Sequence, residues 1–305
     1  MSLLRRRTPW IILLLVIGAS APGWMGAYFL GVFTTAYYFG VFAMSWDLLF
    51  GFAGEVNFGP TFMIGLGAYA AGLMNNAGFG IPICLIGGAA AAVVGGLLLA
   101  LPALRLRGPY FGLVTLVSVL LLLDCIVIFA SVTGGEIGMM VPDVLSVSAS
   151  VNYWYAFGFL VISAFILYGL SVSSVGLILQ ATGQDRVGAA ALGFNVTKHK
   201  LAAFCISALF SGLAGGLVTF YGGIASVDTV VSLSITVQIV IAVVFGGRRT
   251  ILGAILGAIF LILAGELLRP IGQLNTFVVS AVALAVIIFF PNGALGWLLR
   301  PRDQA

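Results

Sequence analysis

The chain has 305 residues, of which 62% are apolar and only 7% are charged, and its formal net charge is +4. In a soluble domain roughly a quarter of the residues are charged. The 13 basic and 9 acidic side chains of this chain are too few to form the polar surface of a water-soluble protein of its size. This composition excludes a cytosolic enzyme, a nucleic-acid-binding domain and a disordered chain. It indicates an integral membrane protein.

Long unbroken apolar runs predict membrane-spanning helices of about 20 residues each, because spanning strands would alternate over short segments. We therefore expect an all-α membrane protein, a polytopic bundle of about ten transmembrane helices that forms a single domain over residues 1–305. Charges and Pro/Gly breaks place the expected spans at roughly 9–29, 31–50, 58–77, 82–104, 110–131, 153–174, 201–222, 231–247, 251–269 and 275–298.

The first of these spans has two interpretations. Arg5–Arg7, the apolar run Trp10–Ile17 and the small residues Ala19–Ala21 together resemble a cleavable signal peptide. The apolar character resumes at once and continues to Ser45, which favours a first transmembrane helix.

The basic residues predict the orientation, because cytoplasmic loops are enriched in Lys and Arg. With the amino terminus in the cytoplasm, Arg269 is the one basic residue of the 13 that falls outside. Both termini are therefore expected to be cytoplasmic. The residues on the inner side are Arg5, Arg6, Arg7, Arg105, Arg107, Arg186, Lys198, Lys200, Arg248, Arg249, Arg300 and Arg302.

Two loops are long enough to have a function. The external loop, about 132–152, carries Glu136 and Asp143 and no basic residue. The internal loop, about 175–200, is polar, and the stretch 188–193 in its middle predicts a short helix that ends at glycine. We expect this helix to lie across the cytoplasmic face.

Ionisable residues within membrane helices are costly, by at least about 2.5–3.5 kcal/mol at a helix centre, and so mark candidate sites. Asp47 and Glu55 lie near the inner ends of spans, where water can reach them. Glu266 can pair locally with Arg269, three residues further on. Asp124 lies well inside the fifth span, so we expect it to face the bundle interior or a watery path.

The segment Gly51–Pro60 interrupts two apolar runs with three glycines, a proline and two polar side chains. Backbone groups released by such a break must line a cavity or meet other polar groups, and broken helices often border transport sites. A plain turn on the inner side explains the same residues.

Cofactor chemistry is not indicated. The three cysteines are scattered in apolar runs, and His199 lies between two lysines with no other metal ligand beside it. The glycines at 65 and 67 lack the lysine that a nucleotide-binding glycine loop needs. We expect no metal, no cofactor, no enzymatic activity and no ATP binding by this chain alone.

Four stretches together resemble the permease subunits of branched-chain amino acid ABC importers, of the LivM type, over nearly the whole chain. They are Gly51–Gly54 through Asn57–Gly59 to Gly65–Tyr69; Tyr110, Phe111, Thr115 and Leu116 with Thr133–Gly135, Gly138 and Met139; Gly176 through Asp185 to Ala191–Val196, with Lys200–Phe204 and Gly212–Gly215; and Gly246, Gly247, Gly253, Gly257 and Ala258 with Phe290–Gly293.

The resemblance implies that the chain forms a path through the inner membrane for a branched-chain amino acid or a similar small polar solute. It implies four kinds of partner: two ABC ATPase subunits, a second homologous permease, an external solute-binding protein and the lipid bilayer. The coupling residues that it implies, in the inner loop, are Gln180, Gln184, Asp185, Arg186, Ala190, Leu192 and Gly193. The expected residues of the translocation path are Asn57, Phe58, Gly59, Asp124, Thr133, Gly134 and Gly135.

One other class of function remains open from the residues alone. A secondary carrier or channel for urea, an amide or an amino acid would need no ATPase. Such a protein should carry more intramembrane ionisable residues for ion coupling than this chain does. A membrane-embedded enzyme is a more distant alternative, because no nucleophile, base or metal set can be assembled from the sequence.

Overall fold

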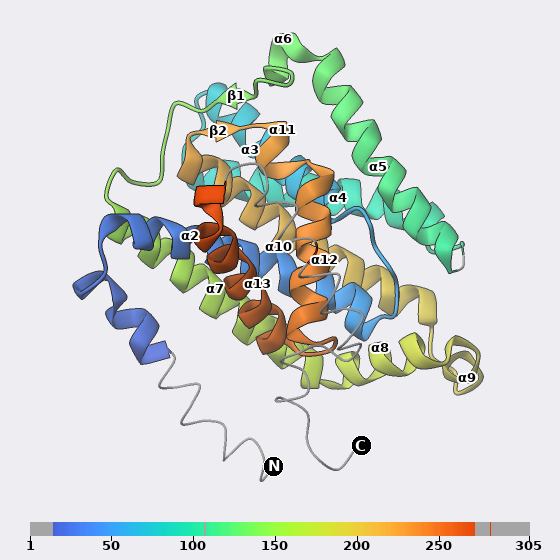
Figure 1. The fold of residues 1–305 in the computed structure, drawn as a ribbon. Helices are drawn as coiled ribbons and strands as arrows, with labels where there is room; N and C mark the ends of the chain where they lie inside the picture. The colour runs from blue at the N-terminus through green and yellow to red at the C-terminus, as the bar shows by residue number, and fades with distance from the viewer. Residues whose placement is uncertain (1–14, 107, 272–280, 282–305) are drawn as a thin grey trace.

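A computed structural model describes residues 15–106, 108–271 and 281 of the chain, and it is mostly helical (Figure 1). The longer helices are α2 (Ala27–Asp47), α3 (Pro60–Asn76), α4 (Ile81–Ala103), α5 (Pro109–Ile128), α7 (Ala149–Val172), α8 (Ser174–Gln184), α10 (Val196–Gly222), α12 (Leu233–Gly246) and α13 (Ile251–Leu267). The short elements are η1 (Ala21–Gly23), η2 (Leu48–Phe52), α6 (Ala130–Thr133), β1 (Met139–Met140), α9 (Arg186–Ala191), β2 (Ile224–Ala225), α11 (Val227–Val230) and η3 (Arg269–Ile271).

Six helical segments of the described residues are long and apolar enough to cross a membrane. They are Ala27–Phe52, Ile81–Ala103, Pro109–Ile128, Ala149–Val172, Val196–Gly222 and Val227–Gly246. A multi-pass helical membrane protein is thus confirmed, whereas the expected ten spans are not. α3 and α13 have 17 residues each, and the expected span 275–298 lies outside the described residues except for Ala281.

The boundary expected near residue 30, between the first two spans, is wrong. The helix break lies instead at Ala21–Gly23, and α2 runs without interruption past Gly31. Pro22 and Gly23 end the preceding helical turn, because proline cannot donate the helical hydrogen bond and glycine disfavours the helix. Gly31 continues the helix and lies near the Tyr221 hydroxyl.

The most tightly packed part of the bundle is formed by α3, α4 and α10, which contact one another along their lengths. Glycines make this approach possible. A Cβ at Gly67 on α3 would lie only 2.7 Å from the carbonyl carbon of Gly212 on α10, and one at Gly88 on α4 would lie 2.5 Å from the Gly67 oxygen. The helix backbones therefore touch directly, as small residues allow in membranes.

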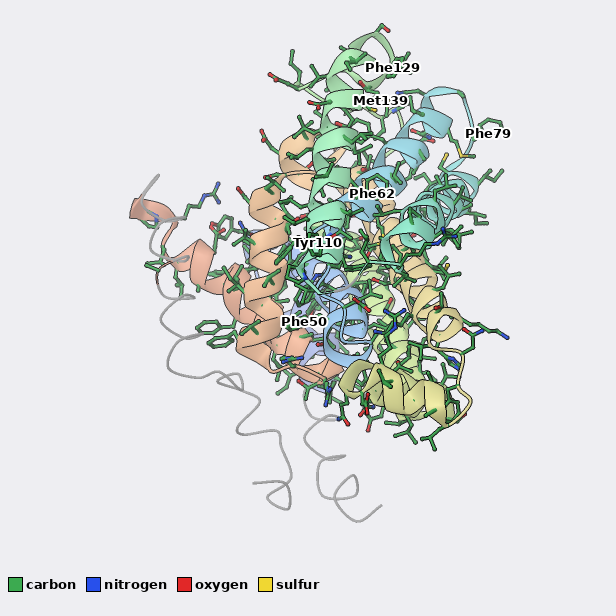
Figure 2. The ribbon with its side chains drawn as sticks, turned by 90° about the vertical axis from the view of Figure 1, so that its right-hand side faces the viewer. Phe50, Phe62, Phe79, Tyr110, Phe129 and Met139 are labelled. Carbon is green, nitrogen blue, oxygen red and sulfur yellow. The ribbon has the colours of Figure 1, made fainter. Side chains whose placement is uncertain are left out.

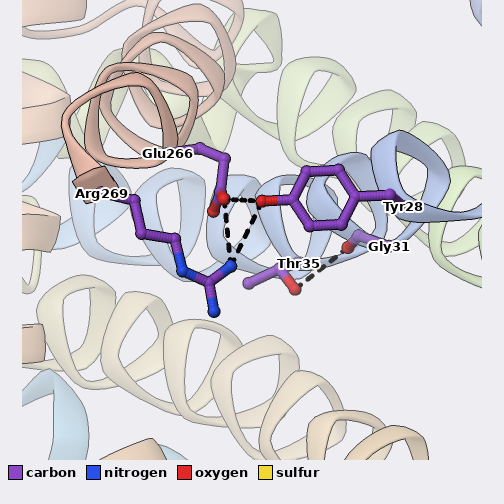
Figure 3. A network of polar contacts seen from close by, with 5 residues as sticks. All are labelled: Tyr28, Gly31, Thr35, Glu266 and Arg269. Atoms are coloured by element: carbon purple, nitrogen blue, oxygen red, sulfur yellow. Dashed lines mark hydrogen bonds and ion pairs between the residues drawn. The ribbon is translucent and has the colours of Figure 1, made fainter.

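α2 contacts α10 of this compact group, and it also packs against α7, α12 and α13. A polar cluster joins α2 to the end of α13 (Figure 3). Arg269 donates to Glu266 at 3.1 Å, as the sequence predicted, and also to the hydroxyl of Tyr28 at 3.2 Å; that hydroxyl in turn donates to Glu266. The cluster therefore connects the beginning of α2 to the end of α13.

The opposite end of α2 meets a different set of basic residues. The Arg248 guanidinium lies 4.5 Å from the centre of the Phe50 ring, and the Arg249 side chain donates to the Gly51 carbonyl at 2.8 Å. Asp47 accepts from the Arg249 backbone N–H at 3.2 Å. Arg248 and Arg249 therefore lie at the η2 end of α2, and Arg269 lies at the other end.

The loop 132–152 is held on the bundle at the end where α3 finishes. β1 pairs antiparallel with β2, and the Asn75 side chain donates to Asp143 at 2.8 Å and accepts from the Asp143 backbone N–H. The loop is therefore fixed to both α3 and the segment that follows α10.

The close contact of α3 with α10 yields a first prediction. Gly67→Ala should lower the free energy of unfolding by about 1–3 kcal/mol, because the added methyl group meets backbone that cannot move aside. Thermal unfolding of the purified protein in detergent measures the change. Gly158→Ala on α7, where no atom lies within 4 Å of the added Cβ, is the matched control and should have little effect. Equal stability of the two variants would contradict the packing described.

Candidate functional site

The break after α2 is the most irregular part of the bundle. α2 continues into one π-helical turn, η2, and residues 53–59 then leave the helical pattern before α3 begins at Pro60. We call residues 53–59 the elbow. Its backbone is paired by other means: the N–H of Glu55 donates to Leu49, and that of Gly59 donates to the Asn57 side chain. The Trp46 indole donates to the Asn57 carbonyl at 2.5 Å.

The elbow also contacts α5. The Phe58 N–H donates to the Thr115 hydroxyl at 3.0 Å, and a Cβ at Gly59 would lie 3.2 Å from the Ser118 hydroxyl oxygen. Thr115 is the seventh residue of α5, about 9 Å along that helix. In Figure 2, Phe62 in the first turn of α3 accordingly lies between Phe50 at one end and Phe129 at the other. α3 thus begins inside the bundle, which favours a broken helix over a plain turn at the membrane surface.

The other expected path residues lie on α5 or shortly after its end. Asp124 lies about 13 Å beyond Thr115 along the helix, and Thr133, Gly134 and Gly135 form the turn after it. Gly134 and Gly135 have positive φ values of 75° and 59°, and the Gly135 N–H donates to the Thr133 hydroxyl. The expected path residues are therefore arranged along one helix and do not surround one point.

Asp124 does not face the interior of this chain's bundle, and that part of the expectation is wrong. It is exposed, on the same side of α5 as Val117, Leu120 and Leu121. The buried side of α5, which carries Phe111, Thr115, Val119, Leu122 and Ile126, contacts α3 and α4 instead. The other part of the expectation, that Asp124 faces a water-filled path, stays a prediction.

The inner loop predicted from sequence forms α8 and α9. Asp185 is the N-cap of α9, where its carboxylate accepts from the N–H groups of Val187 and Gly188 at 2.9 Å each, and Gly193 ends the turn after α9 with a φ of 87°. The short helix and its glycine stop are thus confirmed. Of the remaining expected residues, Gln184, Ala190 and Leu192 are exposed, whereas Gln180 and Arg186 are half-buried.

Two features near α9 were not found by sequence reasoning. The side chains of Val187 and Leu192, in α9 and just after it, are 78% and 77% exposed, so this segment presents two large apolar side chains. Lys200 was assigned to a solvated loop, but its ammonium group forms a nearly buried ion pair with Glu55 at 2.6 Å. Nothing in the local sequence indicates this pairing, because the two residues are 145 positions apart.

The described residues contain no group of three or more His, Cys, Asp or Glu side chains that could hold a metal ion. The described part of the chain is instead a polytopic helical bundle with a broken helix inside it and an exposed segment, α8–α9, at one end. Broken helices inside polytopic bundles often border transport sites, so this architecture is typical of membrane transport proteins.

Residues 28–291 match the profile of the family described as the branched-chain amino acid transport system permease component. The chain belongs to this family, and it is a permease component that provides a translocation path for a small solute.

Curated relatives include the high-affinity branched-chain amino acid permease LivM of Salmonella typhimurium and of Escherichia coli K12. Each is 26% identical to this chain, over 96% of it and 76% of the relative. The autoinducer 2 import permease LsrC of Escherichia coli O9:H4 is 27% identical over 74% of this chain and 68% of its own length. No solved structure matches the chain.

The contact between the elbow and α5 yields a second prediction. Thr115→Val should lower the free energy of unfolding by about 1 kcal/mol, because the Phe58 N–H then loses its acceptor in a partly buried place. Thr115→Ser keeps the hydroxyl and should recover most of this loss. Thermal unfolding in detergent measures both variants, and a valine variant as stable as the serine variant would contradict the hydrogen bond.

Proposed function

We propose that the chain is the transmembrane permease subunit of an ABC importer in the inner membrane. It provides the path, and separate ATPase subunits bind the α8–α9 segment and drive transport. The exposure of the apolar side chains of Val187 and Leu192 supports the proposal. A capped helix that presents apolar side chains beyond the membrane helices is suited to bind a partner protein.

The distribution of basic residues supports the cytoplasmic location of α8–α9. Lys200, Arg248 and Arg249 contact η2 or the elbow, which follows η2 directly, whereas Arg269 lies at the far end of α2. Basic residues concentrate on the cytoplasmic side, so the η2 end faces the cytoplasm. The loop 132–152 then faces the exterior, where a solute-binding protein would deliver its solute, and both termini are cytoplasmic.

The exposed face of α5 supports a second permease subunit as a partner. A lone carboxylate such as Asp124 is costly against lipid. We propose that this face is turned toward the translocation path, between this subunit and a homologous one. Asn57–Gly59 and Thr133–Gly135 then lie along the same path.

The names of the relatives support a small polar solute. LivM is named for branched-chain amino acids and LsrC for autoinducer 2. We propose a branched-chain amino acid or a similar solute, with urea and short amides as the further candidates. No enzymatic role follows from the residues of the path.

The alternative, a secondary carrier or channel, predicts solute flux without ATP. Purified alone in liposomes, the chain should not accumulate radiolabelled leucine or urea. Uptake should appear only with an ATPase subunit, the second permease and a binding protein from the same cell. Concentrative uptake by the chain alone would overturn the importer proposal.

The docking surface yields a third prediction. Val187→Glu combined with Leu192→Glu should reduce co-purification of the ATPase subunit about tenfold or more, because interface anchors dominate binding energy. Quantitative immunoblotting of the affinity-purified chain measures the loss. Val147→Glu is the matched control, since Val147 is 97% exposed in the loop before α7. Unchanged ATPase recovery in the double variant would place the docking surface elsewhere.

The path yields a fourth prediction. In a chain whose three cysteines are replaced by alanine, a cysteine at position 124 should react rapidly with a membrane-impermeant maleimide, because we place it beside water. Phe165→Cys on α7, where the native side chain is 79% exposed on an apolar face, should react slowly. Slow reaction at both positions would place Asp124 against lipid.

A further inference from the structure

We infer that the elbow couples the α8–α9 segment to α5, and that the ion pair of Glu55 with Lys200 is the positioning contact that holds the two together. This inference rests on the proposed function, because it concerns how ATP-driven movement of α8–α9 reaches the translocation path.

The elbow is held by the α8–α9 region at two points, one on each side of α9. Before α9, the backbone of Gly183 in α8 touches the elbow: a Cβ at Gly54 would lie 2.8 Å from the Gly183 Cα, and one at Gly183 would lie 3.0 Å from the carbonyl carbon of Ala53. Gly54 has a φ of 71°, a conformation that other residues rarely adopt. After α9, Lys200 in the first turns of α10 binds Glu55.

The ion pair is well placed to transmit force. Its two side chains are 6% and 13% exposed, and the Nζ–Oε1 distance is 2.6 Å. At such low exposure the attraction is weakly screened, and separating the two groups would leave an uncompensated charge in a nearly buried place. Movement of the start of α10 therefore carries Glu55 with it.

The far side of the elbow is bound to the path. Three residues after Glu55, the Phe58 N–H donates to Thr115, and Gly59 lies against Thr115 and Ser118. A contiguous series of contacts thus runs from α9 through Gly183 and Lys200 to the elbow, and from the elbow to the middle of α5. α5 itself is packed mainly on α3, α4 and the short α6, so the elbow is its contact with the α8–α9 side of the molecule.

The test uses the assembled importer, with its ATPase subunits and second permease, in proteoliposomes. Phe58→Cys in the cysteine-free chain reports on the elbow through its rate of reaction with a water-soluble maleimide, with and without ATP and vanadate. The parent complex should show a rate change of about two- to thirtyfold, the range of coupling carried by such contacts. Lys200→Met should abolish most of this change while the complex still assembles and hydrolyses ATP.

Three further variants separate coupling from folding. The neutral pair Glu55→Gln with Lys200→Met leaves no unpaired charge, so it should assemble normally and still lose the ATP-dependent change. The exchanged pair Glu55→Lys with Lys200→Glu should restore it. Lys198→Met removes an exposed charge two residues away and should leave it intact.

A full ATP-dependent change in the neutral pair would overturn the inference, since the ion pair would then be only structural. A parent complex that hydrolyses ATP without any change at position 58 would overturn it as well, and the importer proposal would survive. Failure to recover any ATPase with the parent chain would instead overturn the proposed function.

Discussion

The seven residues of the elbow interrupt the helices inside the bundle, so their backbone polar groups need hydrogen-bond partners that the helices do not supply. The helical pattern stops after η2, so other groups supply the acceptors: the Leu49 carbonyl, the Asn57 side chain and the Thr115 hydroxyl. Because each unpaired backbone group inside the bundle would cost several kcal/mol, the elbow must keep these hydrogen bonds. The hydrogen bond to Thr115 therefore fixes where α3 begins relative to α5.

Close packing at glycines allows α3 to begin inside the bundle, as the elbow requires. α3 starts deep inside the protein and can be held there only if α4 and α10 approach its backbone closely. Gly67, Gly88 and Gly212 provide this approach, which leaves α3, α4 and α10 as a compact group. α2 then links this group to α7, α12 and α13 on its other side. The same helix carries η2, so both groups of helices meet near the α8–α9 segment.

The parts of the molecule that were predicted from sequence are those encoded by local patterns. Apolar runs gave the helical class, and Asp185 and Gly193 delimited the short helix α9 because caps act within a few residues. The Glu266–Arg269 pair was found for the same reason, since its members are one turn apart. The break of the first span was misplaced near residue 30, although Pro22 and Gly23 are local helix-ending signals and the apolar run across Gly31 continues as one helix, α2.

Long-range features were out of reach for a single sequence. The exposure of Asp124 depends on which side of α5 meets α3 and α4, and a nearly uniformly apolar helix does not encode its own orientation. The ion pair of Glu55 and Lys200 joins positions 145 residues apart, and its burial arises only when α10 passes the elbow. The ion pair lies between the segment proposed to bind the ATPase and the elbow, whereas Asp124 lies on α5, the helix proposed to line the path.

The central claim is that a separate ATPase binds the tip of the α8–α9 segment. A photo-activatable amino acid at position 192, irradiated in native membranes, tests this directly, since mass spectrometry identifies whatever lies within reach of the side chain. The account predicts a cross-link to a nucleotide-hydrolysing subunit. Cross-links to lipid alone, or to proteins without nucleotide-hydrolysing activity, would contradict it.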